Sequence, residues 1–400
     1  MNRNVFALDL GTSKFSLSCL VYNKKNQYYD LFVETVPAQG MKRGMISDLN
    51  IAKKSLYDLM MKTEKSHNVD VDKVVVSVAG GHLASRTVSC QIELPKGQVT
   101  QESTHLLGST CKLQVQEKGR EVLHFLPLLY SVGDKGDVEN PVGFHGKVLK
   151  GKFFVIDADK SSLRDIVALC NQGGLEVSRI YSQSYVSAAA TLVEEQKENG
   201  VVALNIGAGT TEGIIYQDGS PSELFSINLG GGIMNNDLAI AFNLTEANAC
   251  QLKHHFGLLT KSSPVKVCDI YGKEKVITSD QVFNVLARRV YELAELISKH
   301  LRTYKGKLGS GIVLTGGASH IKGLSAFLNQ IYNVPVLVKR VQEEWFKEQK
   351  IPVDHIFGDL SHSASLGLIK FFIEENIQTS TGHSSLTPLQ RFFTWLRELS

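Results

Sequence analysis

The chain has 400 residues, of which 43% are hydrophobic and 21% charged, an ordinary globular composition with room for more than one domain. Its 43 basic and 40 acidic side chains leave a formal net charge of +3, too small to indicate nucleic-acid binding. No apolar run approaches the roughly 18 residues of a membrane-spanning helix, and six cysteines without a CxxC pair predict reduced thiols, as in a cytosol.

Apolar runs of strand length alternate with segments of helical period, which is the pattern of an α/β fold. Residues 5–10 (VFALDL) predict a short buried strand that runs directly into GTSK, and residues 15–22 continue in an extended style. Residues 51–67 have the period of an amphipathic helix. Residues 73–80 (KVVVSVAG) then predict another strand, which runs into two glycines.

The chain from residue 81 to about residue 157 has a different character, because it is polar and rich in turns. Residues 94–103 and 133–147 predict loops on either side of the apolar run at 121–132 (EVLHFLPLLYSV). We therefore expect this segment to be an inserted subdomain.

From residue 152 onward the alternation of strands and helices resumes. The expected strands are 152–159, 201–206 and 311–317, and the expected helices are 161–172, 233–256 and 280–304. Residues 374–388 (EENIQTSTGHSSLTP) are polar, mostly small and without period, which predicts a flexible linker.

Three times an apolar strand runs directly into a turn of Gly with Thr or Ser: ALDLGTSK (7–14), ALNIGAGTTEG (203–213) and IVLTGGASHIKG (312–323). Gly lets the backbone approach a ligand without an intervening Cβ, and successive N–H groups can then point at phosphate oxygens. One such turn is common. Two related turns in separate halves, followed by a third Gly pair, predict two phosphate-binding turns across a cleft with a nucleoside platform beside them.

With these motifs the chain resembles the superfamily of actin, sugar kinases and heat-shock-chaperone ATPases over most of its length. Within that superfamily it is most similar to the FtsA family of bacterial cell-division proteins, over about residues 3–373. The stretches that carry this resemblance are AQGMKRGMISDLN (38–50), VSVAGGHLAS (76–85), HFLPLLYSV (124–132), ENPVGFHGKVL (139–149), LGGGIMNNDLAIAF (229–242) and LKHHFG (252–257).

The resemblance implies an α/β, actin-like (ribonuclease-H-like) two-domain fold with an FtsA-type inserted subdomain and a C-terminal amphipathic helix. The implied subdomains are 1A at 1–80, completed by about 157–180 and 345–373; the insert, 1C, at 81–156; 2A at 181–228, completed by about 306–344; and 2B at 229–305. A flexible linker at 374–388 and a membrane-targeting helix at 389–400 would follow.

The same resemblance implies that ATP and Mg²⁺ are bound. Asp9 would lie near Mg²⁺ and contact it through water, the first two turns would hold the phosphates, and the later glycines and Lys253 would meet the nucleoside. The implied cofactor-binding residues are Asp9, Gly11, Thr12, Ser13, Lys14, Asn205, Gly207, Gly209, Thr210, Thr211, Gly231, Gly232, Lys253, Gly316, Gly317 and Ala318.

Three positions depart from the family pattern. Asn205 stands where the family has an Asp, and a neutral amide cannot serve as a general base, so phosphate binding would survive while hydrolysis suffers. Cys250 replaces a Glu beside the adenosine lysine, and Asn235 replaces a Thr beside the Gly pair 231–232. We expect weak or no turnover and name no catalytic residue; a harmless isosteric exchange at Asn205 remains the alternative.

The last twelve residues have the pattern of a membrane-binding amphipathic helix, a feature that the resemblance also implies. At 100° per residue the large apolar side chains fall on one arc of roughly 160°. Thr387 suits the N-cap and Pro388 the first helical turn. The alternative is a helix that docks on its own domain, but two Phe and a Trp suit a bilayer interface. The expected membrane-binding residues are Leu389, Phe392, Phe393, Trp395, Leu396 and Leu399.

The implied partners follow from the family. The C-terminal tail of the tubulin-like protein FtsZ would bind near residues 280–297, where Arg289 and its neighbour Arg288 would meet acidic groups; two solvated arginines are the plainer alternative. Further partners would be other copies of the chain in a filament, membrane lipid, and other division proteins at the insert, but no nucleic acid. The expected location is the cytoplasmic face of the cell membrane at the division site.

Two other functions remain open at this point. A PilM-like adaptor of pilus assembly shares the actin-like module, but does not need a lipid anchor of its own at 389–399. A kinase or chaperone ATPase is disfavoured by Asn205 and by the lack of a long substrate domain after the nucleotide module.

Overall fold

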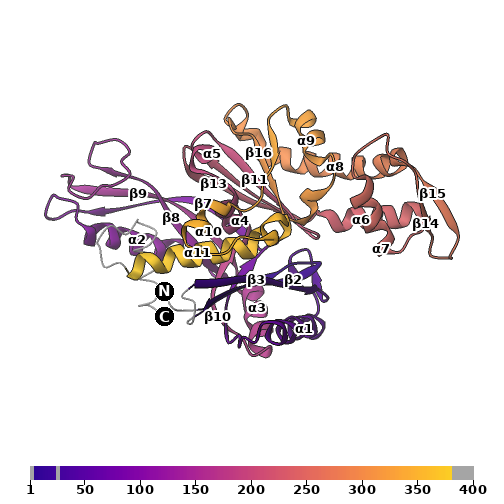
Figure 1. Ribbon diagram of the computed structural model, residues 1–400. Coiled ribbons are helices and arrows are strands. Elements are labelled where there is room, and N and C mark those ends of the chain that lie inside the picture. Colours follow the sequence, from indigo (N-terminus) through magenta and orange to yellow (C-terminus); the bar gives the residue numbers. More distant parts are fainter. Residues whose placement is uncertain (1–3, 24–27, 381–400) are drawn as a thin grey trace.

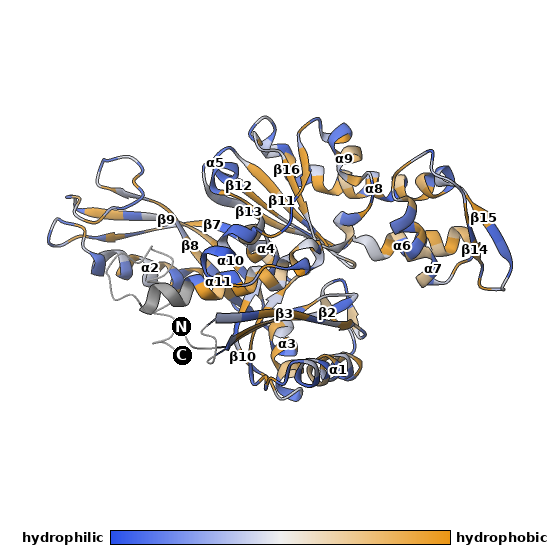
Figure 2. Ribbon diagram, in the orientation of Figure 1, coloured by the Kyte–Doolittle hydropathy of each residue, from blue (hydrophilic) through white to orange (hydrophobic). Residues whose placement is uncertain are grey.

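The computed structural model describes residues 4–23 and 28–380 (Figure 1). Two five-stranded mixed sheets form its centre, and each is a three-stranded antiparallel meander extended by two parallel strands. Figure 2 shows that the strands of the second sheet are largely hydrophobic, as expected of strands that are covered on both faces.

The first sheet has the strand order β10-β6-β1-β2-β3. All six residues of β1 are buried, and Ala7 lies between Ser18 of β2 on one side and Val75 of β6 on the other. The strands are β1 (Val5–Leu10), β2 (Lys14–Asn23), β3 (Tyr28–Pro37), β6 (Lys73–Val78) and β10 (Glu176–Ser182), with the small hairpin β4 (Met41–Lys42) and β5 (Met45–Ile46) nearby.

The second sheet repeats this arrangement in the order β13-β12-β11-β16-β17. Its strands are β11 (Val201–Ile206), β12 (Thr211–Gln217), β13 (Ser220–Ile227), β16 (Ile312–Thr315) and β17 (Val336–Val338). The hairpin β11–β12 therefore corresponds to β1–β2, and the parallel strand β16 corresponds to β6.

Helices cover the two faces of the first sheet. The face towards the second sheet packs against α11 (Ser363–Ser380), which also lies along α4 (Gln183–Thr191). The opposite side carries α1 (Leu49–His67) and α3 (Lys160–Gln172) (Figure 1). Smaller elements are α5 (Glu194–Glu198), α10 (Glu343–Glu348) and the 3₁₀ helices η3 (His355–Gly358) and η4 (Leu360–His362).

The segment after β6 forms a three-stranded sheet of its own in the order β7-β9-β8, covered by one helix. These elements are β7 (Leu83–Glu93), α2 (Gln101–Val115), β8 (Arg120–Val132) and β9 (Val148–Asp159). The expected loop at 94–103 is partly wrong, because Thr100 accepts a hydrogen bond from the Ser103 amide and caps α2. Residues 152–159 also do not resume the main alternation, since β9 is the central strand of this small sheet.

The segment after β13 contains α6 (Gly231–Phe242), α7 (Glu246–Phe256), β14 (Val265–Cys268), β15 (Glu274–Ile277) and α8 (Ser279–Leu301), followed by the 3₁₀ helix η1 (Arg302–Tyr304). The single helix expected over 233–256 is wrong. Asn243 has φ 54° in the left-handed region and ends α6, and Thr245 caps α7 by accepting from the Asn248 amide. After β16 follow η2 (Gly317–His320) and α9 (Leu324–Tyr332).

The last described helix corrects the expected linker. Residues 374–380 belong to α11, because nothing in FFIEENIQ breaks a helix, so the absence of regular structure expected from residue 374 is wrong for these positions. The rest of the linker and the amphipathic helix at 389–400 lie outside the described residues. Within the described ranges, no helix has both the length and the apolarity needed to cross a membrane.

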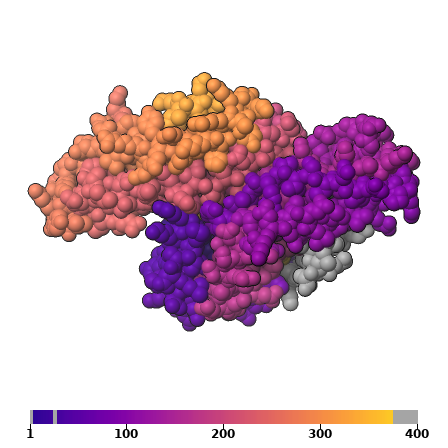
Figure 3. Space-filling model, turned by 180° about the vertical axis from the view of Figure 1, so that it is seen from behind, coloured from indigo at the N-terminus to yellow at the C-terminus, as the bar shows by residue number. Residues whose placement is uncertain are grey.

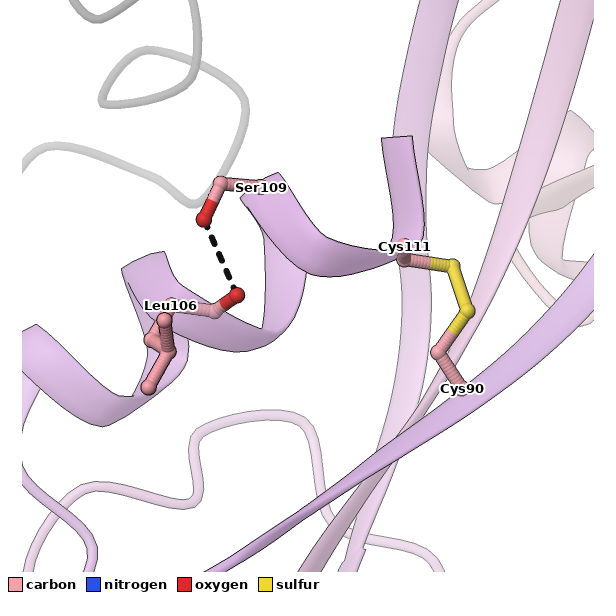
Figure 4. The surroundings of a disulfide bond; sticks show 4 residues. All are labelled: Cys90, Leu106, Ser109 and Cys111. Carbon is pink, nitrogen blue, oxygen red and sulfur yellow. Dashed lines mark hydrogen bonds between the residues drawn. A yellow bond between two sulfur atoms is a disulfide. The ribbon is translucent and has the colours of Figure 1, made fainter. Parts of the chain in front are cut away.

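A disulfide joins Cys90 on β7 to Cys111 on α2 (Figure 4). The expectation of six reduced cysteines is therefore wrong for this pair, which lies 21 residues apart and has no sequence motif. The remaining thiols are Cys19, Cys170, Cys250 and Cys268. The bond fixes α2 to the sheet of the insert, where these elements enclose a small core of their own. Leu126 and Phe154 of the insert instead belong to the large core that both main sheets share.

The insert and the segment with α6–α8 project at opposite ends of the molecule in both views (Figures 1 and 3). The two hairpins β1–β2 and β11–β12 lie between these ends, and their turns form the site described next.

Candidate functional site

The turn after β1 and the turn after β11 contact each other. A Cβ added to Gly209 would lie 2.4 Å from the hydroxyl oxygen of Thr12, so a side chain at this position would force the two turns apart. Thr12 is itself held by the Gly44 amide, which donates to its hydroxyl at 3.0 Å. The two Gly-rich turns predicted from the sequence are thus brought face to face across the two sheets.

Two adjoining cavities lie around this contact. The smaller, of about 80 Å³, is enclosed by both turns together with Asp9, Asn205 and Gly316. The larger, of about 950 Å³, extends from the same turns to α6, α7 and η2. Because both cavities are lined by Thr12–Lys14, Gly207–Ala208, Gly317 and Ser361, they form one continuous site with a narrow end and a wide end. Backbone groups of both turns line the narrow end, a lining that suits phosphate oxygens, and the wide end has room for a larger and less polar group.

Asp9 is buried at the narrow end. The Ser77 hydroxyl donates to its Oδ1 at 2.7 Å and the Gln183 amide donates to the same oxygen at 2.8 Å. Burial raises the pKa of Asp9, and these two hydrogen bonds oppose the rise. One oriented carboxylate suits Mg²⁺, which keeps most of its waters and takes its other ligands from phosphates. No cluster of three or more His, Cys, Asp or Glu side chains in the described residues could hold a metal alone.

Lys14 reaches into the site from the first residue of β2, and its ammonium donates to the Ser361 hydroxyl. Burial lowers the pKa of Lys14, whereas Asp359 and Asp9 act in the opposite direction. Sequence reasoning missed Ser77, Gln183 and Ser361. Only Ser77 had a signal, since its strand runs into a Gly pair like the recognised turns.

Asn205, the last residue but one of β11, lines the narrow cavity. Its amide nitrogen donates to the Ser187 hydroxyl on α4 at 2.9 Å. A Cβ on Gly316 would lie 2.2 Å from the Asn205 Oδ1, and Gly316 also has a positive φ of 86°. Gly316, the first glycine after β16, is therefore needed for the fit of Asn205, besides any contact with a ligand.

The wide end is built around the start of α6. The Lys253 ammonium is buried and donates to the Gly231 carbonyl at 3.0 Å. Burial lowers the pKa of Lys253. A Cβ on Gly231 would lie 2.7 Å from the Ala318 Cβ, so these two segments are in close contact. The other side chains of this wall are Asn235, Glu246, Cys250, His254 and His320.

Glu212 on β12 links the two halves of the molecule from behind the turns. It is fully buried and accepts hydrogen bonds from the Gly80 amide at 3.0 Å and the Ser226 hydroxyl at 2.9 Å. Gly80 follows β6 of the first sheet, so this bond joins the two sheets. Burial raises the pKa of Glu212 to about 7, although the hydrogen bonds act against the rise.

Most of the predicted cofactor residues line this site, but Thr211 does not. Its hydroxyl donates to the Leu229 carbonyl at 2.8 Å, and the residue lines neither cavity. Gly11, Thr210 and Gly209 line the narrow end, and Gly232 and Ala318 line the wide end. The predicted membrane-binding residues 389–399 lie outside the described part of the chain.

Arg288 and Arg289 line a separate cavity of about 420 Å³ between α6 and α8. The Arg289 guanidinium is already paired, because two of its nitrogens donate to Asp237 at 2.7 and 2.9 Å and a third donates to Glu292. Arg288 is exposed, and within the described residues no ion pair or hydrogen bond of its side chain is found. Arg288 is therefore the cation that a ligand in this cavity could use.

Sequence comparison gives two family matches that together cover most of the chain. Residues 80–157 match the SHS2 domain inserted in FTSA, and residues 202–364 match the cell division protein FtsA. The cell division protein FtsA of Escherichia coli (strain K12) is 25% identical over 350 residues, 84% of this chain and 83% of that protein. FtsA of Borreliella burgdorferi is 26% identical over 391 residues, 94% of this chain and 92% of its own.

Solved structures show the same fold. The PilM-PilN type IV pilus biogenesis complex superposes with a TM-score of 0.61 at 15% identity, covering 92% of this chain and 98% of that one. MreB5 of Spiroplasma citri bound to ADP gives a TM-score of 0.55 at 16% identity, covering 94% and 98%. Identities this low show the fold alone. That fold is the two-domain actin-like arrangement that the family resemblance implied.

Proposed function

The chain belongs to the FtsA family of cell division proteins, and from this premise we propose that it is an ATP-binding, filament-forming adaptor that tethers FtsZ to the membrane. The observation that carries the nucleotide part of this proposal is the contact between Gly209 and Thr12. It brings two backbone-lined turns to one narrow cavity beside a buried carboxylate and a lysine.

ATP with Mg²⁺ fits the two ends of this site. The polyphosphate would occupy the narrow end between Thr12–Lys14 and Gly207–Thr210, and Asp9 would orient waters on Mg²⁺. The adenosine would lie at the wide end against Gly231, Lys253 and Ala318. The remaining proposed contacts are Gly11, Asn205, Gly232, Gly316 and Gly317, whereas Thr211 acts by fixing the second turn. Mg²⁺ supplies charge neutralisation of the phosphates when bound.

Turnover by this site would be weak. The Asn205 amide nitrogen is committed to Ser187 and the side chain carries no charge. Its oxygen would therefore attract Mg²⁺ waters less strongly than a carboxylate, and it cannot accept a proton from an attacking water. A bound nucleotide would still favour the closed arrangement of the two halves through its greater affinity for that arrangement. Assembly could thus depend on binding alone, with slow hydrolysis acting as a reset.

The membrane part of the proposal rests on residues 389–400. A three-turn amphipathic helix with almost no net charge would bind lipid only marginally as a single copy. Several copies on one filament would bind far more strongly, because each attachment raises the effective concentration of the next. The protein would therefore lie at the cytoplasmic face of the cell membrane at the division site, with other division proteins binding the insert.

The FtsZ tail would bind in the cavity between α6 and α8. Its acidic groups would meet Arg288, while Arg289 shapes the cavity wall through its pair with Asp237. A PilM-like role in pilus assembly is the weaker alternative. It rests on the likeness of fold alone, whereas both family matches are to division proteins.

The nucleotide proposal can be tested with the chain's own cysteines. Cys250 lines the wide end of the site, and Cys268 is exposed on β14. ATP with Mg²⁺ should slow maleimide labelling of Cys250 and leave labelling of Cys268 unchanged, as measured by mass spectrometry of the two peptides. Equal labelling rates of Cys250 with and without saturating ATP would refute a nucleoside at this wall.

The membrane proposal needs a second experiment. Full-length protein should co-sediment with liposomes more strongly when ATP is present, and a chain lacking residues 389–400 should remain in the supernatant. Liposome binding by the truncated chain in the absence of FtsZ would show that another surface holds the lipid.

A further inference from the structure

The turn that precedes α11 reaches into the narrow end of the site, although no nucleotide motif includes it. This turn consists of residues 359–361, that is Asp359 and the first two residues of η4, and it lies just before α11 begins at Ser363. Ser361 lines both cavities, and Asp359 lines the larger one. The turn also contacts the second half of the molecule, because the Gly316 amide donates to the Leu360 carbonyl at 3.2 Å.

Three hydrogen bonds connect Lys14 to Asp359 through this turn. The Lys14 ammonium donates to the Ser361 hydroxyl, which in turn donates to the Asp359 Oδ1 at 2.6 Å. The Ser361 amide donates to the same oxygen at 2.9 Å. Ser361 thus accepts from the cation and donates to the anion, which is an ordered relay between two opposite charges.

Asp359 is charged at neutral pH. Burial acts to raise its pKa, but hydrogen bonds from Ser361 and the charges of Lys14 and His362 outweigh burial and lower the pKa to about 2. The histidines His362 and His320 lie 3.5 and 3.4 Å from its carboxylate oxygens. A fixed negative charge therefore lines the wide end of the site, one hydrogen bond away from Ser361, which also lines the narrow end that would take the polyphosphate. At this junction the charge repels a polyanion.

We propose that Asp359 and Ser361 form a resting site for the Lys14 ammonium, from which the terminal phosphates of a nucleotide must withdraw it. This inference rests on the proposed nucleotide site. It adds that Asp359 and Ser361 compete with the nucleotide phosphates for the Lys14 ammonium. Asp359 weakens the binding of ATP and ADP, because their terminal phosphates contact Lys14. It has little effect on the binding of AMP, whose single phosphate does not extend to Lys14. Binding of a di- or triphosphate would also remove the Lys14 contact from Ser361, two residues before α11 begins at Ser363.

The structure offers a matched control for this charge. Asp354 and Asp359 both cap short 3₁₀ helices, since Asp354 accepts from the Ile356 amide at 3.0 Å just as Asp359 accepts from Ser361. Neither cavity is lined by Asp354. Asp354→Asn and Asp359→Asn therefore make the same chemical change and keep the cap, but only the second removes a charge from the site.

The test is the dissociation constant of full-length protein for ATP, ADP and AMP, measured by equilibrium dialysis. Asp359→Asn should tighten the binding of ATP and ADP about threefold to tenfold, the range expected for one half-exposed charge. It should change the dissociation constant for AMP less than about twofold. Ser361→Ala should tighten ATP in the same direction by a smaller factor, which guards against a folding defect of one variant. Asp354→Asn should match the unmodified chain.

Failure of the inference is distinguishable from failure of the nucleotide proposal. If the unmodified chain binds none of the three nucleotides, both are overturned. If it binds ATP but Asp359→Asn leaves the affinity unchanged or weaker, the resting site is overturned while the nucleotide site stands. Equal tightening of ATP and AMP would also overturn it, because the effect would not depend on the phosphates that reach Lys14.

Discussion

Glu212 is the buried residue whose protonation should matter most for stability. Its pKa is raised by burial to about 7, whereas the same carboxyl in the unfolded chain titrates near its ordinary value of 4.5. The folded state therefore holds more protons between those two values, and its stability falls as the pH rises through this window. Above pH 7 the carboxylate is charged in both states and its full burial penalty remains.

Glu212→Gln should remove this penalty, because Gln is neutral and its oxygen can still accept from the Gly80 amide. We expect the variant to be more stable than the parent at pH 8 by up to about 3 kcal/mol, and the advantage to shrink towards pH 5. Urea denaturation of both chains at the two pH values measures the difference. A variant that is destabilised equally at pH 5 and pH 8 would contradict the assigned titration.

Asn205→Asp tests whether the missing carboxylate at this position is the cause of weak ATP hydrolysis. The Ser187 hydroxyl can rotate and donate to the new carboxylate, so the substitution fits the existing contact. It adds a second buried acid to the cavity that already holds Asp9, which should destabilise the chain without ligand and make Mg²⁺ bind more tightly. Phosphate release from Mg-ATP should rise about tenfold or more. No rise would mean that Asn205 does not limit hydrolysis.

Contacts between elements explain which sequence expectations failed. The Gly-rich turns could be predicted because glycine at a strand end has a backbone reason that is local. The break between α6 and α7 was missed because the left-handed Asn243 interrupts an otherwise continuous helical period. The pairing of Cys90 with Cys111 was missed because only the packing of α2 on β7 brings them together. Gln183 and Ser361 had no local signal for the same reason.

The Cys90–Cys111 disulfide should stabilise the insert by fixing α2 to β7 (Figure 4). A closed loop of this length restricts the unfolded chain by about 3 kcal/mol. Dithiothreitol should lower the denaturation midpoint of the insert in the parent chain, and should have no such effect on a Cys90→Ser/Cys111→Ser variant. Cys268→Ser is the control, because that thiol is exposed and unbridged. Resistance of the parent to reductant would argue against a stabilising bond.

The two arginines on α8 should behave differently when each is replaced. Arg288→Ala should weaken binding of an FtsZ tail peptide about tenfold, as expected for the loss of one charge-assisted contact, and leave the melting temperature unchanged. Arg289→Ala should destabilise the chain by about 1 kcal/mol, because Asp237 loses its partner between α6 and α8. Fluorescence anisotropy and thermal melts separate the two effects. If Arg289→Ala lost peptide binding and Arg288→Ala did not, Arg289 and not Arg288 would be the residue that contacts the peptide.

At the scale of the whole molecule, the repeat of one sheet topology is the feature that the sequence showed least clearly. Three turns in which a strand runs into glycine were recognised from the sequence. Because β6 holds the same place in the first sheet as β16 in the second, the Gly pair after β6 is a fourth turn of this kind. The likeness to a family supplied the order of the domains. Sheet pairing over a hundred residues of sequence separation has no local pattern, so the structure was needed to show it.

Gly209→Ala should prevent the two halves from closing, since its Cβ would meet Thr12 at 2.4 Å. We expect about tenfold weaker ATP binding and loss of the steep concentration dependence of liposome binding, because closure and assembly are linked in the proposed function. Gly136→Ala is the matched control, as a Cβ there meets no atom within 4 Å. Co-sedimentation over a range of protein concentrations measures the effect. Unchanged cooperativity in Gly209→Ala would separate assembly from closure.

The position of α11 has a consequence for how such a protein would lie on a bilayer. The helix has 18 residues, a length of about 27 Å, and a Cβ on Gly367 would lie 2.4 Å from the Val186 carbonyl oxygen. A helix packed this closely cannot swivel independently of the body. The point at which residues 381–400 depart is therefore set by the first sheet. Every subunit in a row would start its tether to the lipid from the same flank, so a bent row would hold its attachment points along a curve.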